Sequence, residues 1–173
     1  IPLLRVPASV QDRSARQALN LGLADFVVCS FGLLSRTKLN HRLLESWLAS
    51  RLAEDQNCVL VFAGENDAGD YGQSLLKTIR NSGLAKRIRV TGWLDTATFR
   101  QYLAAADVGV QLRTLSRGET SAAVLDCMNY GLPTIINANG SMADLPDKGV
   151  WKLPDEFSDD ELREALEALW RDV

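Results

Sequence analysis

Residues 26–64 read FVVCSFGLLSRTKLNHRLLESWLASRLAEDQNCVLVFAG, and this stretch decides the fold. It begins and ends with short apolar runs, Phe26–Phe31 and Cys58–Ala63, which have the length and composition of buried strands. Strands that are apolar throughout must be covered on both faces, and helical crossovers between parallel strands supply that cover. Between the two runs, one helical stripe is expected from the spacing of Leu39, Leu43, Leu44, Trp47 and Leu48.

The same alternation of apolar runs and helical segments continues to the end of the chain. Further strands are expected at Ile88–Thr91, Val108–Leu112, Thr134–Asn137 and Val150–Leu153. Helices are expected at Gln11–Leu21, Lys38–Glu54, Tyr71–Ser82, Ala97–Ala105, Ser121–Tyr130 and Asp159–Arg171. Capping residues fit these limits: Asp95 and Ser158 precede helices, and Gly83 and Gly131 follow them. The pattern predicts an α/β protein with a doubly wound, Rossmann-like parallel sheet of about six strands.

Size and composition restrict the function further. The 173 residues suffice for one domain, residues 1–173, in which residues 1–24 are expected to lead in from an upstream domain. The net charge is −3 and the 19 Lys and Arg residues are scattered, which does not favour a nucleic-acid partner. The chain has one histidine and three widely separated cysteines, a composition that predicts no metal site and a reducing, cytoplasmic location. No apolar run is long enough to span a membrane.

Ligands of open parallel sheets bind beyond the carboxyl ends of the strands, so the loops that follow the strands are the candidate sites. After the first strand, Gly32 permits close backbone approach, and Arg36 and Lys38 place two cations beside a helix N-terminus. This combination suits a diphosphate. In the alternative interpretation, Thr37 caps the helix and the cations are solvated. Residues 64–69 have the glycine spacing of a nucleoside-triphosphate loop but lack its lysine, and the first loop has one glycine where a dinucleotide site needs three.

Residues 113–121 form the most informative loop, because polar residues there run into a helix whose first turn has small side chains. Backbone amides at such a helix start can face an anion. Glu119 lies at the start of this helix. Asp126 lies farther along it among apolar residues, where an unpartnered carboxylate is costly to bury. Alternatively, Asp126 faces solvent or makes a structural hydrogen bond.

The sequence of residues 116–135, SRGETSAAVLDCMNYGLPTI, resembles the signature region of family 4 glycosyltransferases of the GT-B type. Thr91-Gly-Trp-Leu94, Tyr102-Leu-Ala-Ala-Ala-Asp-Val108 and the loop from Phe31-Gly32 to Lys38 are similar to that family's other motifs, in the same order. The resemblance covers about residues 26–145. It implies the C-terminal, donor-binding domain of a retaining hexosyltransferase.

The resemblance also implies roles for single residues. Lys38 is expected to bind the nucleotide diphosphate and Asp126 the ribose, with Glu119 contacting the donor hexose. The amides of Thr120, Ser121 and Ala122 are expected to approach the phosphates, and Gly92, Trp93 and Leu94 to lie by the base. Trp93 either stacks on the base or packs against the protein.

The expected donor is a UDP- or GDP-sugar, and neither a metal nor another cofactor is implied. A glycan or lipid-linked acceptor is expected to bind an N-terminal domain that this chain lacks, so the chain alone is expected to be inactive. The resemblance is compatible with polysaccharide biosynthesis and with peripheral membrane association of the full-length protein.

Three positions depart from the family's pattern. Leu33 stands where an arginine is usual, so the second phosphate cation is either missing or supplied by Arg36. The usual spacing between the two acids points to Gly118 instead of Glu119, and Asp126 replaces a glutamate. Two alternatives remain: a domain like that of a nucleotide-sugar 2-epimerase, against which the single histidine, His41, counts, and a non-catalytic nucleotide-binding α/β domain.

Overall fold

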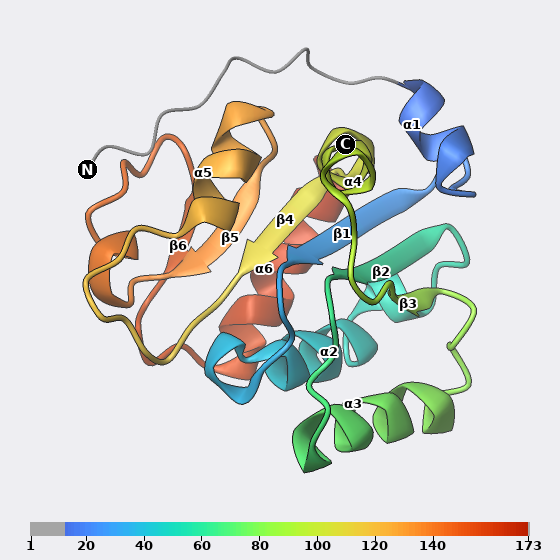
Figure 1. Ribbon diagram of the computed structural model, residues 1–173, viewed down its shortest axis with the longest axis horizontal. Helices are drawn as coiled ribbons and strands as arrows, with labels where there is room; N and C mark the ends of the chain where they lie inside the picture. The colour runs from blue at the N-terminus through green and yellow to red at the C-terminus, as the bar shows by residue number, and fades with distance from the viewer. Residues whose placement is uncertain (1–12, 173) are drawn as a thin grey trace.

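The computed structural model describes residues 13–172, which form one six-stranded sheet with helices on both faces (Figure 1). The strand order is β3-β2-β1-β4-β5-β6, and all five pairings are parallel. The predicted fold class is therefore confirmed. The strands are β1 (Phe26–Phe31), β2 (Cys58–Ala63), β3 (Ile88–Val90), β4 (Val108–Gln111), β5 (Thr134–Asn137) and β6 (Trp151–Leu153).

The direction of winding reverses between β1 and β4, which are neighbours in the centre of the sheet. The chain moves outward from β1 to β2 and β3, and then returns to β4 and moves outward on the other side. At such a reversal the two loops that leave the strands diverge, so a crevice opens beyond their carboxyl ends.

Successive residues of the strands face opposite sides, and each side packs against its own set of helices. Val28, Leu60 and Phe62 share one core with α2, α3 and α6, whereas Val27, Cys29 and Val61 share another with α1 and α4. The helices are α1 (Arg13–Ala18), α2 (Asn40–Leu48), α3 (Asp70–Asn81), α4 (Thr96–Ala105), α5 (Ala122–Asn129) and α6 (Asp159–Arg171).

The predicted helix over Lys38–Glu54 is wrong in its extent, because three shorter pieces replace it. These are the 3-10 turn η1 (Arg36–Lys38), α2 and the 3-10 turn η2 (Arg51–Ala53). Leu39 separates η1 from α2 with a left-handed backbone, φ 53°. The buried side chain of Asn40 fixes this break, since it accepts a hydrogen bond from the Ser35 amide at 3.0 Å and donates one to Ser30 Oγ at 3.3 Å. Of the expected stripe, Leu39, Leu43, Leu44 and Trp47 are buried, and Leu48 is partly buried against the same core.

The predicted boundaries of the strands and of the helices after α2 hold to within a residue or two. Asp95 caps α4 and Ser158 forms a capping box with Glu161, while Gly83 and Gly131 follow their helices with φ of 73° and 64°. Ser121 is the N-cap of α5 instead of its first residue. For the helix expected over Gln11–Leu21, the structure shows Arg13–Ala18, and residues 1–12 of the expected lead-in lie outside the described residues.

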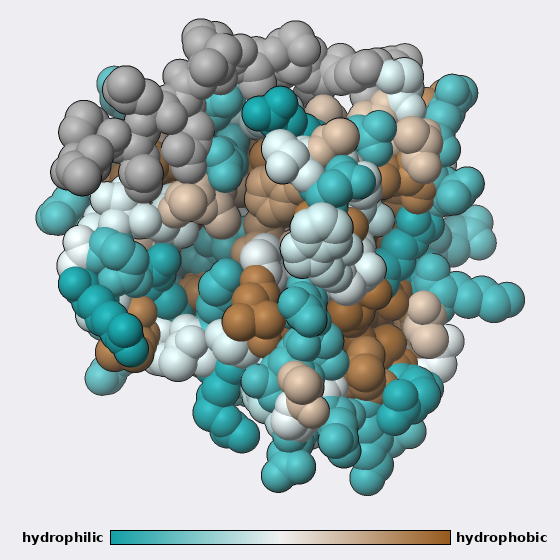
Figure 2. Space-filling model, viewed as in Figure 1, coloured by the Kyte–Doolittle hydropathy of each residue, from teal (hydrophilic) through white to brown (hydrophobic). Residues whose placement is uncertain are grey.

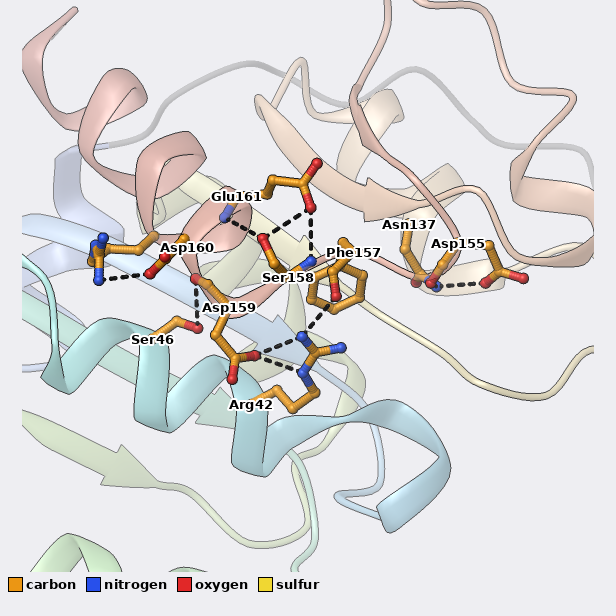
Figure 3. A network of polar contacts seen from close by, with 10 residues as sticks. Arg42, Ser46, Asn137, Asp155, Phe157, Ser158, Asp159, Asp160 and Glu161 are labelled. Atoms are coloured by element: carbon orange, nitrogen blue, oxygen red, sulfur yellow. Dashed lines mark hydrogen bonds and ion pairs between the residues drawn. The ribbon is translucent and has the colours of Figure 1, made fainter.

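The start of α6 is tied to α2 by a polar network (Figure 3). The Arg42 guanidinium on α2 pairs with Asp159 at 2.6 Å and stacks 3.9 Å from the ring centre of Phe157. Just before this point, Asp155 accepts hydrogen bonds from Asn137 and Asn139. The network therefore fixes the segment after β6 against the end of β5, at the edge of the sheet where the candidate site lies.

The three cysteines are buried free thiols, as their apolar surroundings predicted. Burial raises the pKa of Cys58 and Cys127 to about 12. In Figure 2, hydrophilic residues lie along the right and lower rim of the face, and hydrophobic residues lie nearer its middle. No helix among residues 13–172 is both long and apolar enough to cross a membrane.

Candidate functional site

A cavity of about 380 Å³ lies beyond the ends of β1 and β4, where the winding reverses. Loops that are far apart in the sequence meet there: the turn after β1, and the loop that connects β4 to α5. The polar or glycine residues of its lining are Gly32, Lys38, Gln111, Arg113, Glu119, Thr120, Ser121 and Asp126, and the others are Phe31, Phe99, Leu112, Ala122, Ala123 and Met142.

Lys38 reaches this cavity across Gly32. Its Nζ lies 3.5 Å from the carbonyl oxygen of Phe31, and a Cβ atom on Gly32 would lie only 2.6 Å from Nζ. Gly32 also has a φ of 94°, which disfavours any side chain. Burial, and then the positive charge of Arg113, lower the pKa of Lys38 from its ordinary value. The glycine therefore makes room for an ammonium group that is partly withdrawn from water.

Arg113 contributes a second cation to the same cavity. Its side chain is 14% exposed, and its NH1 donates to Glu119 Oε1 at 3.1 Å. The backbone of Arg113 is held by the buried side chain of Asn137: the Arg113 amide donates to Asn137 Oδ1 at 2.9 Å, and Asn137 Nδ2 donates to the Arg113 carbonyl at 2.8 Å. This pairing ties the second residue beyond the end of β4 to the last residue of β5.

Glu119 lies at the cavity's exposed rim. Its Oε2 accepts a hydrogen bond from the Arg117 amide at 2.7 Å, and its carbonyl oxygen accepts one from Ser141 Oγ at 2.7 Å. Hydrogen bonds from its own amide and from the Arg117 amide lower the pKa of Glu119. Glu119 lines the cavity, whereas Gly118 forms an exposed turn with φ 84°. Of the two candidates for the first acid, only Glu119 has a side chain that contributes a carboxylate to this site.

The N-terminus of α5 opens into the cavity. Ser121 caps the helix by accepting a hydrogen bond from the Val124 amide at 3.4 Å, and alanines occupy the next two positions. A helix start with small side chains presents backbone N–H groups and partial positive charge to an anion. Asp126 is half-buried one turn farther along and also lines the cavity, so it does not simply face solvent.

Four of the predicted residues lie elsewhere. Arg36 lines a second cavity of about 330 Å³ between α2 and α3, with its guanidinium 5.6 Å from the ring centre of Tyr71. Gly92, Trp93 and Leu94 follow β3 and do not line the first cavity. Trp93 is 76% exposed, which excludes the interpretation that it packs into the core.

Two polar residues of the cavity lining had no predicted role of their own. Gln111 ends β4, and its side-chain amide, oriented to satisfy its partners, donates to the Phe31 carbonyl at 3.2 Å and accepts from the Phe31 amide at 2.7 Å. Arg113 is the other. One signal was available for Arg113, since a cation two residues beyond a central strand must lie near the crevice. Within residues 13–172, no three His, Cys, Asp or Glu side chains are grouped as metal ligands would be.

The comparisons with known proteins agree with this geometry. The family model of glycosyl transferases group 1 matches residues 25–172. The C-terminal domain of the group 1 glycosyl transferase LpcC from Francisella tularensis superposes with a TM-score of 0.79 at 19% identity, covering 95% of this chain and 84% of that one. Among curated proteins no sequence matches.

Two longer proteins share the fold. Sucrose-phosphate synthase from Thermosynechococcus elongatus has a TM-score of 0.79 at 20% identity, with 94% of this chain and 40% of that one covered. Anabaena HepE, in complex with UDP and glucose, has a TM-score of 0.78 at 22% identity, with 94% and 44% covered. The chain thus spans less than half the length of either protein. By its family match and its fold, the chain belongs to the group 1 glycosyl transferases and corresponds to their C-terminal GT-B domain.

Proposed function

We propose that this chain binds the nucleotide-sugar donor for a retaining hexosyl transfer. One observation carries the proposal: a single cavity at the reversal of the sheet combines a helix N-terminus, a partly buried ammonium group and two carboxylates. The first two features suit the diphosphate of the donor, and the carboxylates suit its hydroxyl groups. HepE, which shares the fold, was crystallised with UDP-glucose as well as with UDP.

The cavity provides electrostatic stabilisation for a leaving diphosphate. When the bond from the sugar to the phosphate breaks, negative charge grows on the phosphate oxygen. The ammonium group of Lys38 and the amides at the start of α5, around Ser121 and Ala122, are fixed before the reaction and need little reorganisation to meet that charge. The proposed chemistry therefore uses protein groups and no metal ion.

The two carboxylates have separate proposed tasks. Asp126 lies deeper, one turn inside α5, and is assigned to the ribose hydroxyls. Glu119 lies at the rim, and is assigned to the hexose hydroxyls. Ionised carboxylates accept hydrogen bonds and cannot donate them, which fits hydroxyl groups as ligands. Trp93, exposed after β3, is assigned to the nucleobase, since an exposed aromatic ring offers a stacking surface.

The acceptor is proposed to be a glycan or a lipid-linked sugar, bound by an N-terminal domain. Because the chain spans only part of its longer relatives, it is expected to bind the donor without transferring the sugar. No feature of the cavity favours a 2-epimerase instead, since His41, the chain's single histidine, lines the second cavity.

Isothermal titration calorimetry with the chain tests this proposal. UDP, GDP, UDP-glucose, free glucose and inorganic pyrophosphate are titrated separately. We expect one of the two nucleoside diphosphates to bind, and UDP-glucose to bind as well if that nucleotide is UDP. Pyrophosphate should bind more weakly, and free glucose should not bind. If neither nucleotide nor nucleotide sugar binds at millimolar concentration, the donor-site proposal is wrong.

A further inference from the structure

The loop after β1 supplies fewer cations to the cavity than its sequence suggests. Leu33, at the position where the resemblance led us to expect arginine, is exposed and does not line the cavity. Arg36 lies over Tyr71 in the other cavity. Lys38 is therefore the only Lys or Arg of residues 32–38 in the lining. A diphosphate carries more negative charge than one ammonium group can neutralise.

The neighbouring loop contains a cation in the required place. Arg113 lines the same cavity as Lys38, and its side chain is mostly withdrawn from solvent. The two loops are also joined directly, since the Thr114 amide donates to the Thr37 carbonyl at 2.9 Å. This bond aligns the residue after Arg113 with the residue before Lys38. The two cationic residues therefore approach the cavity from the loops that follow two adjacent strands, β1 and β4.

We propose that Arg113 is the second cation for the diphosphate of the donor, in place of the residue missing at Leu33. The inference rests on the proposed function and assigns a binding residue within the same site. A guanidinium has five N–H donors and matches phosphate oxygens in a bidentate geometry. Within residues 13–172, the guanidinium of Arg113 donates to Glu119 through NH1. Its other N–H groups are available to an anion.

Glu119 orients the guanidinium in this arrangement. Its carboxylate is held by the Arg117 amide and its carbonyl by Ser141, so the rim of the cavity is a fixed acceptor for Arg113. The positive charge of Arg113 contributes to the lowered pKa of Lys38, and such mutual repulsion is relieved when an anion lies between the two cations.

The backbone of Arg113 does not depend on its side chain. Asn137 binds the amide and the carbonyl of residue 113, and any residue except proline retains both groups. A substitution at this position therefore removes the cation without releasing the loop. This property makes Arg113 a suitable residue for a binding experiment.

The test compares Arg113→Ala, Arg113→Gln and Arg113→Lys with the unchanged chain, titrated with UDP, UMP and uridine (or the guanosine series, if GDP is the nucleotide that binds). We expect Arg113→Ala and Arg113→Gln to weaken UDP binding about 10-fold to 100-fold, as for loss of a charge-assisted hydrogen bond, and to leave uridine unchanged. Arg113→Lys should retain part of the affinity. The control is Arg80→Ala, since Arg80 is an exposed arginine on α3.

The outcomes separate this inference from the proposed function. If the unchanged chain binds UDP and both neutral variants bind it within about twofold of that affinity, Arg113 is not the second cation. If uridine binding falls as much as UDP binding, the effect is on the fold and the inference is overturned. If the unchanged chain binds no nucleotide, the proposed function itself is wrong. As a second readout, NMR titration should show the pKa of Lys38 rising in Arg113→Gln, because a like charge has been removed.

Discussion

The two cavities on either side of η1 contain similar groups but differ in how those groups are arranged. The cavity beyond β1 and β4 has its cations, Lys38 and Arg113, beside a helix start, with carboxylates at its rim and along α5. In the cavity between α2 and α3, Arg36 lies against the ring of Tyr71, whose hydroxyl also meets the amide and the ring of His41. In the second cavity Arg36, Tyr71 and His41 thus contact one another, whereas the first cavity combines two cations with a helix start that suits an anion.

The 3-10 turn η1 explains why Arg36 and Lys38 lie in different cavities. Arg36 and Lys38 are two residues apart on the same 3-10 turn, so their side chains leave it in different directions. A motif that counts cations in a loop therefore overestimates the charge delivered to a site. Position along the loop decides which cavity receives each cation.

The largest expected effect distinguishes these two cations. Lys38→Ala should weaken UDP binding about 10-fold to 100-fold, because a charge-assisted contact to the diphosphate is lost, whereas Arg36→Ala should change it less than about twofold. Calorimetry with both variants measures the difference. Equal losses would mean that η1 delivers both cations to one ligand, contrary to the distinction drawn between the cavities.

A somewhat smaller effect is expected for the carboxylate of α5. Asp126→Asn should weaken UDP binding about tenfold and leave inorganic pyrophosphate unaffected, because the ribose contact is lost and the phosphate contacts remain. Asp70→Asn, in the second cavity, is the matched control. A loss of pyrophosphate binding in Asp126→Asn would show that Asp126 supports the loop instead of the ribose.

The smallest effect concerns the second cavity alone. Burial lowers the pKa of His41 from its ordinary value of 6.5, with Arg36 and Arg42 lowering it further and Glu45 and Asp159 opposing them. Between its lowered pKa in the folded chain and pH 6.5, His41 therefore binds more protons in the unfolded chain than in the folded one. Its contribution to the free energy of unfolding is complete above pH 6.5 and is lost as the pH falls through this range. His41→Gln should flatten this dependence in urea unfolding between about pH 5 and pH 7.5. If the free energy of unfolding depends on pH in the same way in His41→Gln as in the unchanged chain, the assignment of this pH dependence to His41 is wrong.

Sequence reasoning predicted the fold more completely than the site. The strands follow from apolar runs such as Phe26–Phe31, and the limits of α4 and α6 from the caps Asp95 and Ser158, because these signals are local. Seven of the residues predicted for the site line one cavity: Gly32, Lys38, Glu119, Thr120, Ser121, Ala122 and Asp126. Their proposed roles remain to be tested by the experiments above.

The remaining details depend on buried polar side chains whose partners cannot be predicted from the sequence. The direction of Arg36 depends on the left-handed backbone of Leu39 and on Asn40, a buried amide whose bonds within residues 30–40 fix the turn. The support of Arg113 depends on Asn137, 24 residues later. No sequence pattern reveals these bonds, so the break in the predicted helix and the support of Arg113 became apparent only in three dimensions.

The pairing between Asn137 and the backbone at position 113 has a consequence for variation within the family. Because the support comes from the end of β5 and binds only main-chain atoms, residue 113 is free to change its chemistry while its position is kept. If Arg113 binds the diphosphate as proposed, one substitution adjusts the affinity of the site and leaves the bonds to the main chain of residue 113 in place. Position 113 is accordingly a place where evolution or design can exchange tight donor binding for faster release of the spent nucleotide.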